Sequence, residues 1–397
     1  MASRKRPGRK IRVEMRSNRA RQARGQDWTR QFQSDEQRVV DADRSESVRA
    51  KGAVSRKRTL IVDDADLPAV DEAQWLQGVV TTVHGLVSQV DADGVTWECT
   101  TRRKLRTLLI EQRAPVAVGD RVWFSDQSRL HDGARVGVIE RVDPRRSALS
   151  RRDFRGREHT LVANADQLVI VASVARPRIK PHLIDRYLVA AGKGRLRPVI
   201  CFHKWDLARE APLDAPGGHE EADAGGLTFD ELLDEFRALG YCCLRTSATT
   251  GEGLDDFRRE LQGRTSVLSG QSGVGKSSLI NAIQPGLQLE VAEVSHENEK
   301  GRHTTTRARL LRLDSGGYVV DTPGIRQFDL WSVAPGELEA FFPEIAAHVG
   351  QCRFRDCHHR EEDDGCAVTA AVAAGRISAR RYASYRKALS ELAEERR

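Results

Sequence analysis

The chain has 397 residues, a formal net charge of +7 and 39% hydrophobic residues, which suggests about two to four domains with enough apolar side chains for a substantial core. No apolar run reaches about 18 residues, which excludes a membrane-spanning helix, and the basic amino terminus lacks the apolar segment of a secretion signal. Seven cysteines in so long a chain do not indicate a disulfide scaffold. Three of them cluster with histidine near the carboxyl terminus and indicate a metal site in a reducing cytoplasm.

The amino-terminal stretch is strongly basic. Residues 1–60 carry 18 Lys or Arg against 7 Asp or Glu, a net charge of +11, so the remainder of the chain sums to −4. Because it has few aromatic residues and no sustained apolar period, we predict a disordered extension over residues 1–74. Such an arm can bind the phosphate backbone of a nucleic acid by displacing counterions. A solvated tail that only raises solubility is the alternative.

Short β-rich segments follow, separated by turn signals such as Asp93-Gly94 and Gly119-Asp120. The predicted strands are 77–83, 86–90, 95–100, 121–125 and 136–142. Five short strands in about 70 residues favour a small barrel, with the OB type as the leading candidate over residues 75–145. Many barrels of this type bind RNA, and others serve only as a scaffold.

After an Arg-rich connector at 145–157, strands and helices alternate. Strands are predicted at 166–174, 198–202, 242–246, 265–269, 310–313 and 317–321, and helices at 184–191, 229–239, 253–261 and 277–282. This alternation indicates a largely parallel sheet covered by helices on both faces, in a domain over residues 146–335.

Two short motifs in this region suit recognition of a base. His203-Lys204-Trp205-Asp206 follows a strand and resembles the N-K-x-D element of GTPases, in which the carboxylate accepts hydrogen bonds from guanine N1–H and its exocyclic amine and repels adenine N1. Histidine in place of asparagine is a departure, because an imidazole donates one hydrogen bond but lacks the amide's paired donor and acceptor. Thr246-Ser247-Ala248 matches the element that supports the guanine oxygen, a weak signal unless the first motif accompanies it.

The strongest motif is a phosphate-binding loop. Residues 270–277 match G-x-x-x-x-G-K-S/T in full, after a predicted strand and before a predicted helix. Backbone N–H groups and the helix amino terminus would hold the phosphates, Lys276 would reach the β- and γ-phosphate oxygens, and the Ser277 hydroxyl would bind Mg²⁺.

Two further segments complete the phosphate chemistry. Asp321-Thr322-Pro323-Gly324 ends a strand; Asp321 suits a Mg²⁺ ligand, and the Gly324 N–H can meet a γ-phosphate. Between this segment and the loop lie three threonines, 304–306, one of which can complete the Mg²⁺ shell; we assign Thr305. The residues that we expect to bind GTP are His203, Lys204, Trp205, Asp206, Ser247, Ala248, Gly270, Gln271, Ser272, Gly273, Val274, Gly275, Lys276, Ser277, Ser278 and Gly324.

The order of these motifs is informative, because the base-reading elements precede the phosphate elements, whereas ordinary GTPases have the reverse order. Circular permutation is physically permissible where the native ends of a domain lie close together. With GQSGVGKSS, GRHTTT and DTPGIRQF, the chain from about residue 75 to 390 resembles the ribosome small-subunit-dependent GTPase A family of circularly permuted bacterial GTPases. The resemblance implies GTP hydrolysis stimulated by the 30S subunit and a role in late maturation of that subunit.

The cysteine cluster is the last motif. Cys352, Cys357, His359 and Cys366 give C-x4-C-x-H-x6-C, three thiolates and one imidazole, which suits one closed, structural Zn²⁺ site. His358 is the alternative histidine; the family resemblance implies His359. Residues 367–397 are predicted to be helical, within a zinc-binding module over residues 336–397 that presents arginines such as Arg353 and Arg355 to RNA.

We therefore expect a multidomain α/β protein, with an OB-type barrel, a circularly permuted P-loop GTPase domain and a C-terminal zinc-binding module. It would hydrolyse GTP to GDP and phosphate with Mg²⁺, as a cytoplasmic monomer that binds the 30S subunit and 16S rRNA but no membrane. Lys276 and Thr305 would act in catalysis. Because Ile325 stands where many GTPases carry a glutamine that orients water, His303 is the candidate for that role. An RNA-binding assembly protein with vestigial hydrolysis is the alternative; a P-loop kinase is disfavoured by the base-reading motif.

Overall fold

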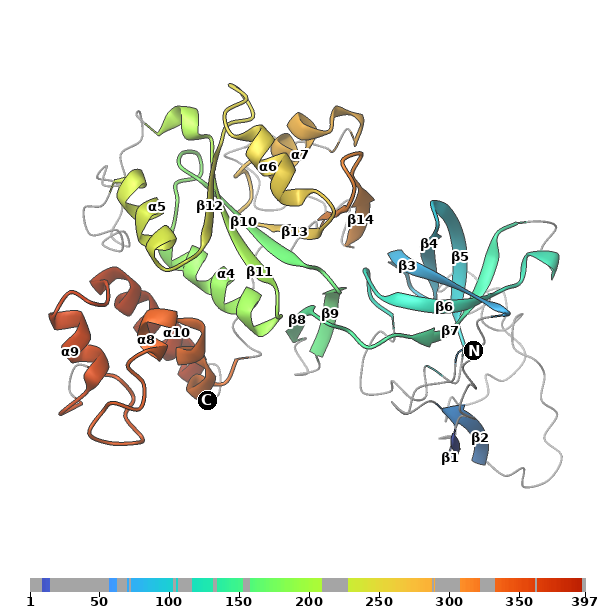
Figure 1. Cartoon of the computed structure of the whole chain (residues 1–397), viewed down its shortest axis with the longest axis horizontal. Helices are drawn as coiled ribbons and strands as arrows, with labels where there is room; N and C mark the ends of the chain where they lie inside the picture. Colours follow the sequence, from blue (N-terminus) through green and yellow to red (C-terminus); the bar gives the residue numbers. More distant parts are fainter. Residues whose placement is uncertain are drawn as a thin grey trace, which may run out of the picture. The chain divides into compact units, whose positions relative to one another are not determined.

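The computed structural model describes the chain in several segments. They are residues 9–14, 57–62, 70, 73–102, 105, 116–130, 134–152, 158–208, 228–287, 289, 308–321, 333–360 and 363–394. The chain divides into two compact units, Met1–Asp71 and Glu72–Arg397. Figure 1 labels the helices and strands of both.

In the first unit, the described residues form an antiparallel pair of strands, β1 (Arg9–Glu14) and β2 (Lys57–Val62). Both carry β-branched residues, such as Ile11 in β1 and Ile61 in β2, which favour an extended backbone. Paired strands thus lie within the extension that the sequence predicts to be disordered. The prediction missed them because the basic charge obscures a short β-pattern whose two halves are far apart in sequence. The rest of that extension, apart from residue 70 and residues 73 and 74, lies outside the described part of the chain.

The second unit begins with a closed five-stranded barrel. Its strands run in the order β3-β4-β5-β7-β6, and β3 also pairs with β6, so the sheet closes on itself. Val80, Val90, Phe124 and Ile139 fill its interior and are fully buried. The prediction of an OB-type barrel is confirmed. The strands are β3 (Trp75–His84), β4 (Val87–Ala92), β5 (Val95–Thr101), β6 (Arg121–Asp126) and β7 (Val136–Val142).

Six strands form the sheet of the α/β region, in the order β12-β11-β10-β13-β15-β14. The first five are parallel, and β14 is antiparallel to β15, as expected of a largely parallel sheet. The elements are β10 (Gln167–Ser173), α4 (Pro181–Lys193), β11 (Arg197–His203), α5 (Phe229–Ala238), β12 (Cys242–Thr246), α6 (Leu254–Leu261), β13 (Thr265–Ser269), α7 (Lys276–Ile283), β14 (Arg309–Arg312) and β15 (Tyr318–Asp321).

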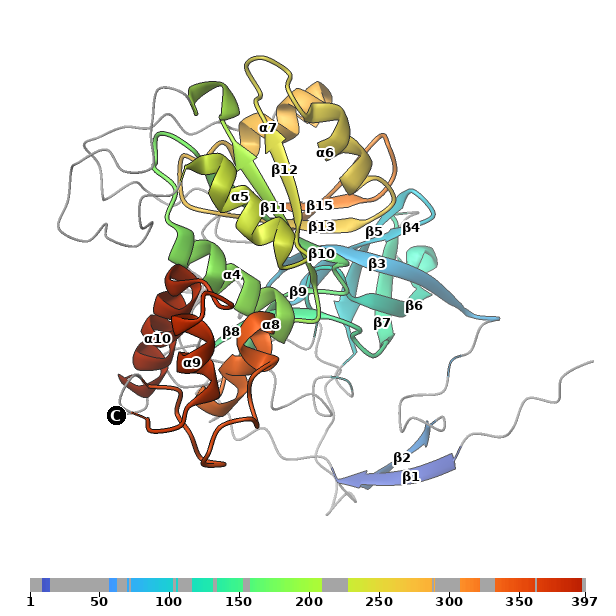
Figure 2. The same cartoon turned by 60° about the vertical axis from the view of Figure 1, so that its left-hand side comes forward.

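Helices cover both faces of this sheet (Figure 2). The side chains of β10 alternate between two cores: Leu168 and Ile170 pack with α4 and α5, whereas Val169 and Val171 pack with α6 and α7. All of β10 is buried, as is typical of a central parallel strand with both faces covered. The sheet therefore holds its strand ends in fixed relative positions.

A hairpin that the sequence analysis missed precedes β10. β8 (Ala148–Arg152) and β9 (Glu158–Ala163) pair where the sequence predicts only an Arg-rich connector. Leu149 and Val162 are buried in the core that contains α4. Because only a few apolar residues stand among many charged ones, local composition hides strands that tertiary burial stabilises.

A buried ion pair joins the barrel to this hairpin. The Arg145 guanidinium donates from Nε to Asp120 Oδ1 (2.8 Å), from Nη2 to Asp120 Oδ2 (2.9 Å) and from Nη1 to Thr160 Oγ1 (2.9 Å). Asp120 is fully buried. A bidentate contact of this kind has a defined geometry and so orients the groups that it joins.

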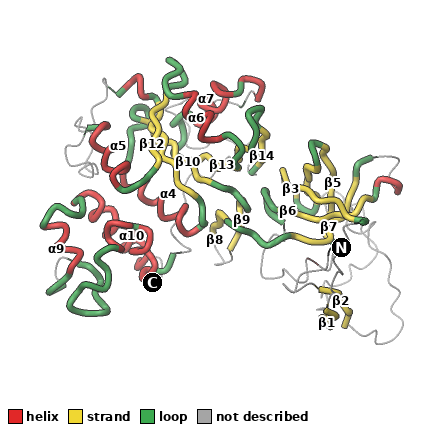
Figure 3. The backbone as a smooth tube through the Cα atoms, viewed as in Figure 1, coloured by secondary structure: helices red, strands yellow, loops and turns green. Residues whose placement is uncertain are grey.

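The C-terminal part of the second unit is helical (Figure 3). Its core includes Leu338, Phe342 and Tyr385 together with Val189 of α4, so it packs against the α/β region. The sequence predicts one helical stretch over 367–397. The structure has two helices there, α9 (Ala367–Ala373) and α10 (Ala379–Glu394), because α9 is followed by a turn at Gly375. Within the described residues, each helix is too short or too polar to cross a lipid bilayer. The elements are η6 (Pro335–Phe341), α8 (Pro343–Ala346), α9 (Ala367–Ala373) and α10 (Ala379–Glu394).

Buried charges fasten this helical part to α4. Asp185 accepts hydrogen bonds from Arg380 Nη1 (2.9 Å) and Arg381 Nη1 (2.6 Å). Arg381 also donates from Nε to Glu344 (2.6 Å), and Arg380 donates from Nε to Glu235 of α5 (2.7 Å). Asp185 and Arg381 are 2% and 1% exposed, so their charges depend on one another.

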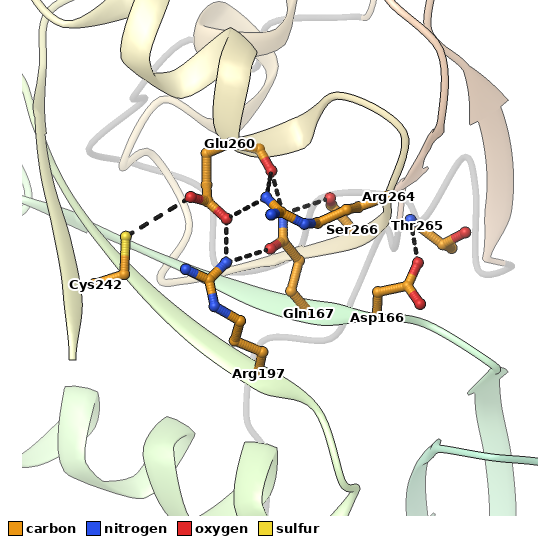
Figure 4. Close-up of polar contacts among 8 residues, drawn as sticks. All are labelled: Asp166, Gln167, Arg197, Cys242, Glu260, Arg264, Thr265 and Ser266. Carbon is orange, nitrogen blue, oxygen red and sulfur yellow. Dashed lines mark hydrogen bonds and ion pairs between the residues drawn. The ribbon is translucent and has the colours of Figure 1, made fainter. Parts of the chain in front are cut away.

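A second polar cluster ties together the amino ends of the parallel strands (Figure 4). Glu260 of α6 accepts hydrogen bonds from Arg197 at the start of β11 and from Arg264 Nη1 (2.7 Å) just before β13. The Gln167 side chain donates to Ser266 Oγ (3.0 Å) and to the Glu260 carbonyl (3.0 Å). These contacts fix the strands at their amino ends. The predicted site residues lie at the other edge of the sheet, at the carboxyl ends of the strands.

Candidate nucleotide-binding and metal sites

A tight loop joins β13 to α7. Gly270 has φ 151°, and a Cβ there would lie 2.1 Å from the Val171 carbonyl oxygen. Gly275 has φ 97°, and a Cβ there would lie 2.7 Å from the His203 ring. Glycine is therefore required at both positions. The first N–H groups of α7, which follow at once, have no partner within the helix and can bind an anion.

Lys276 and Ser277 open α7. The Lys276 ammonium donates to the carbonyl oxygens of Gly270 (2.8 Å) and Gln271 (2.9 Å), so its charge lies within the loop. Ser277 and Lys276 line a small cavity with Val319 and Val320 of β15. Because Asp321 is the last residue of β15, the backbone brings this predicted Mg²⁺ ligand to the same edge of the sheet as Ser277.

His203 and Thr246 end the neighbouring parallel strands β11 and β12, and they are paired in register. His203 Nδ1 lies 3.0 Å from Thr246 Oγ1, and both residues are buried. Burial, together with the positive charge of Lys204, lowers the pKa of His203 to about 4, so the ring is neutral at neutral pH. A neutral imidazole has one donor and one acceptor nitrogen, which is enough for this contact.

Lys204 connects the base-reading segment to the phosphate loop. It has φ 58° and ψ 40°, in the left-handed region. Its ammonium donates to the carbonyl oxygens of Gly273 (2.9 Å) and Arg176. Burial and the nearby Arg176 charge lower the pKa of Lys204. The segments 203–206 and 270–277, predicted separately from the sequence, are therefore in contact.

Asp206 supplies an acceptor at this site. Its Oδ1 atom is buried and has no hydrogen-bond partner among the described residues. A buried carboxylate oxygen without a donor is unfavourable unless a ligand provides one. The Asp206 carboxylate could therefore accept hydrogen bonds from a purine that has two adjacent donors.

The Ser247-Ala248 segment continues from β12 into a turn. Ser247 is fully buried, and its Oγ accepts from the N–H groups of Thr249 (3.2 Å) and Thr250 (3.1 Å). The Ser247 backbone also takes part in the turn, because its N–H donates to the Glu252 carbonyl (2.9 Å) and its carbonyl accepts from the Gly251 N–H (3.0 Å).

The structure brings together most of the predicted nucleotide-binding residues. Gln271, Ser272 and Ser278 lie in the loop and the first turn of α7, and Val274 is buried in the core beneath them. Trp205 begins a 3-10 turn, and the Arg245 guanidinium lies over its ring at 4.7 Å. The predicted residues His303, Thr305 and Gly324 lie outside the described residues, and of Asp321 only the backbone is described.

Four donors gather near the carboxyl terminus. The ligand atoms of Cys352, Cys357, His359 and Cys366 all lie within 4.8 Å of one another. His359 Nδ1 is 3.6 Å from the Sγ atoms of both Cys352 and Cys366, which are 4.0 Å apart. Tetrahedral Zn²⁺ with Zn–S bonds of about 2.3 Å separates its sulfur ligands by about 3.8 Å. The donor set therefore fits Zn²⁺, and His359 rather than the exposed His358 faces it.

Two supporting residues of this cluster were not predicted. His359 Nε2 lies 3.3 Å from Glu339 Oε2, and Tyr382 donates to the His359 carbonyl at 2.8 Å. Carboxylates commonly orient metal-binding histidines in this way. Asp363 accepts from the N–H groups of His358 and Arg360 and so holds the acidic loop between His359 and Cys366. Ligand spacing gives no signal for such partners, because folding alone brings η6 and α10 to the loop.

The largely parallel sheet has a phosphate loop at its carboxyl edge, and the base-reading strands precede that loop in the chain. This arrangement defines a circularly permuted P-loop GTPase. The chain also carries an OB-type barrel and a Cys3His module. Residues 142–331 match the model of the family described as RsgA GTPase. The small ribosomal subunit biogenesis GTPase RsgA of Sodalis glossinidius (strain morsitans) is 38% identical over 326 residues, 81% of this chain and 87% of that protein. The protein of the same name from Yersinia enterocolitica is 38% identical over 333 residues, 82% and 88% of the two chains.

Two solved structures have the same fold. The crystal structure of YjeQ from Thermotoga maritima has a TM-score of 0.59 and 34% sequence identity, and covers 80% of this chain and 98% of its own. YloQ, a circularly permuted GTPase, has a TM-score of 0.59 and 26% identity, and covers 82% and 98%. The chain belongs to the RsgA GTPase family.

Proposed function

We propose that this protein hydrolyses GTP to GDP and phosphate when it is bound to the small (30S) ribosomal subunit, and that it assists late maturation of that subunit. The observation that carries this proposal is the joining of the base-reading and phosphate-binding segments by the Lys204–Gly273 contact of 2.9 Å. That contact supports a single nucleotide site built from two parts of the chain. The names of the relatives in the family supply the ribosomal setting.

Asp206 would select guanine. Its Oδ1, which has no hydrogen-bond partner in the part of the chain that the structure describes, and its second carboxylate oxygen can accept from guanine N1–H and the exocyclic amine. Adenine presents an acceptor at N1 and would leave the buried carboxylate unsatisfied. The Ser247-Ala248 backbone would support the guanine oxygen, and Lys204 would lie along the base.

Lys276 and the amino terminus of α7 would hold the phosphates and stabilise the negative charge that grows during in-line attack by water. Ser277, Thr305 and Asp321 would hold Mg²⁺, which when bound neutralises charge on the β- and γ-phosphate oxygens. The Gly324 N–H would meet the γ-phosphate. Since Ile325 cannot orient water, we assign that role to His303 and expect slow turnover without a partner.

The barrel and the C-terminal module would provide the RNA contacts. Arg353, Phe354 and Arg355 are exposed on the zinc-binding loop, and the Arg353 guanidinium lies 5.2 Å from the Phe354 ring centre. An exposed aromatic beside arginine suits stacking on RNA bases and contact with phosphates. We propose 16S rRNA as the nucleic acid, a monomeric protein, and a cytoplasmic location.

We propose that the chain has four parts with separate roles. Residues 1–74 would form a basic extension, 75–145 the barrel, 146–335 the GTPase domain and 336–397 the zinc-binding module. Zn²⁺, held by Cys352, Cys357, His359 and Cys366, would be structural, because four protein ligands leave no open coordination position.

Phosphate release measured with purified protein alone and with 30S, 50S or 70S particles tests the proposal. We expect slow release alone and marked acceleration with 30S subunits, abolished by Lys276→Ala. A 30S-bound protein that exchanges nucleotide without accelerated release would instead be the RNA-binding assembly protein with vestigial hydrolysis. Equal stimulation by 50S subunits would contradict the assigned partner.

A further inference from the structure

His203 lies between two parts of the nucleotide site. On one side its Nδ1 atom is 3.0 Å from the Thr246 hydroxyl. On the other side the ring packs so closely on Gly275 that a Cβ at that glycine would lie 2.7 Å from Cδ2 and 2.8 Å from Nε2. The side chain is 2% exposed, so its position is determined by these neighbours.

Thr246 is itself well anchored. Its hydroxyl lies 3.2 Å from the Cys201 Sγ atom, and the residue is fully buried at the end of β12. One nitrogen of the His203 ring is thus held by a fixed group of the sheet. The opposite edge of the ring then sets how closely Gly275, at the end of the phosphate loop, can approach the base-reading strand.

The next residue, Lys204, also contacts the phosphate loop. Lys204 reaches Gly273, so residues 203 and 204 contact the phosphate loop at two separate points. The lysine contact depends on a long side chain that can rearrange at small cost. The imidazole is short, planar and buried, and it is the more rigid of the two connections.

We propose that His203 is a positioning residue that couples the base-reading loop to the phosphate loop, so that a nucleotide spanning both is bound more tightly than its parts would predict. The inference rests on the proposed guanine-nucleotide site and concerns a residue that replaces the asparagine of the N-K-x-D element. Loops held in register in advance lose less conformational freedom when one ligand joins them.

Three substitutions separate the two contacts of the ring. His203→Ala removes both. His203→Asn retains a polar group that can reach Thr246 but is too short to fill the space against Gly275. Thr246→Val keeps the ring and its contact with Gly275 but removes the hydroxyl. His348→Ala, a half-buried histidine in the turn after α8, is the matched control.

Competition against fluorescent N-methylanthraniloyl-GDP, with full-length protein and Mg²⁺, tests the coupling with guanosine, pyrophosphate and GDP as competitors. We expect His203→Ala to weaken GDP by about tenfold or more, in the range of typical coupling between sites. Guanosine and pyrophosphate, which each need one loop only, should weaken by less than about threefold. His203→Asn and Thr246→Val should give intermediate losses for GDP, and His348→Ala none.

An equal loss for guanosine and GDP would make His203 a contact of the base alone and overturn the inference. Unchanged GDP affinity in both His203 variants would also overturn it. Near-ultraviolet circular dichroism and the zinc content identify a variant that fails to fold, and Thr246→Val then carries the test. If the wild-type chain itself fails to bind GDP, the proposed function fails; if it binds and the variants behave as the control, only the coupling fails.

Discussion

Asp206 is the residue that we propose to separate guanine from adenine. We predict that Asp206→Asn weakens GDP binding by about a hundredfold or more, because the amide cannot accept from both guanine donors and leaves buried polar groups unpaired. The same variant should gain relative affinity for xanthosine diphosphate, whose O2 can accept from the new amide. Competition measurements with the two nucleotides check this, with the exposed Asp255→Asn on α6 as the control. Retained preference for GDP would show that another residue reads the base.

His203 should leave a signature in the pH dependence of stability. Burial and the Lys204 charge lower the pKa of His203 to about 4, whereas an unfolded chain has a histidine pKa of about 6.5. The unfolded state therefore takes up the proton first, so this stability is complete above about pH 6.5 and is lost as the pH falls toward 4.

Urea unfolding at pH 7.5 and pH 5 measures the effect. Between these values the free energy of unfolding should fall by about 2 kcal/mol more for the wild type than for His203→Asn, since one pKa unit is worth about 1.4 kcal/mol. Equal falls in the two proteins would show that His203 is not held neutral.

Single residues also show what sequence can reveal. The phosphate loop and the four metal donors are predictable because their chemistry requires set residue types at short spacings. Thr246 as the partner of His203, and Glu339 as the partner of His359, are not predictable in this way. Each is brought to its partner by the packing of elements that are distant in sequence.

The contact between α4 and α10 depends on buried charge. Burial alone would raise the pKa of the Asp185 carboxyl, but Arg381 and Arg380 hold it below the usual range. We predict that Asp185→Asn lowers the free energy of unfolding by about 3–5 kcal/mol, because it leaves two buried guanidinium groups without their shared anion.

Chemical denaturation measures this loss, and Glu391→Gln is the matched control. Glu391 also pairs with an α4 residue, Arg186, at 2.5 Å, but its side chain is 31% exposed, so about 1 kcal/mol or less is expected. Equal effects of the two variants would mean that Asp185 does not fasten the C-terminal module.

Strands with a strong pattern have the predicted bounds, such as β12 over 242–246 and β13 over 265–269. The hairpin β8–β9 was missed because its residues are mostly charged and its burial comes from α4 and the barrel. The expected single C-terminal helix is two helices, because its alanine-rich sequence favours helix on both sides of the Gly375 turn.

At the scale of the molecule, permutation places the predicted phosphate-binding segments immediately before the Cys3His module. We predict that Cys366→Ser abolishes zinc binding and unfolds the loop around it, because so short a segment has little core of its own. GDP binding should persist, since the nucleotide residues belong to the sheet. Zinc content, proteolysis near residues 352–366 and GDP affinity measure the three effects, with the non-ligand Cys242→Ser as control. Retention of zinc would contradict the assigned ligands.

We propose that segments in permuted order form one guanine-nucleotide site in this protein. Equilibrium binding of labelled GDP and ADP to the full-length protein with Mg²⁺ tests it most directly. We predict saturable binding of GDP, with ADP weaker by at least about a hundredfold. Equal affinity for both nucleotides, or no binding of GDP even beside 30S subunits, would show that these segments do not form a guanine-nucleotide site.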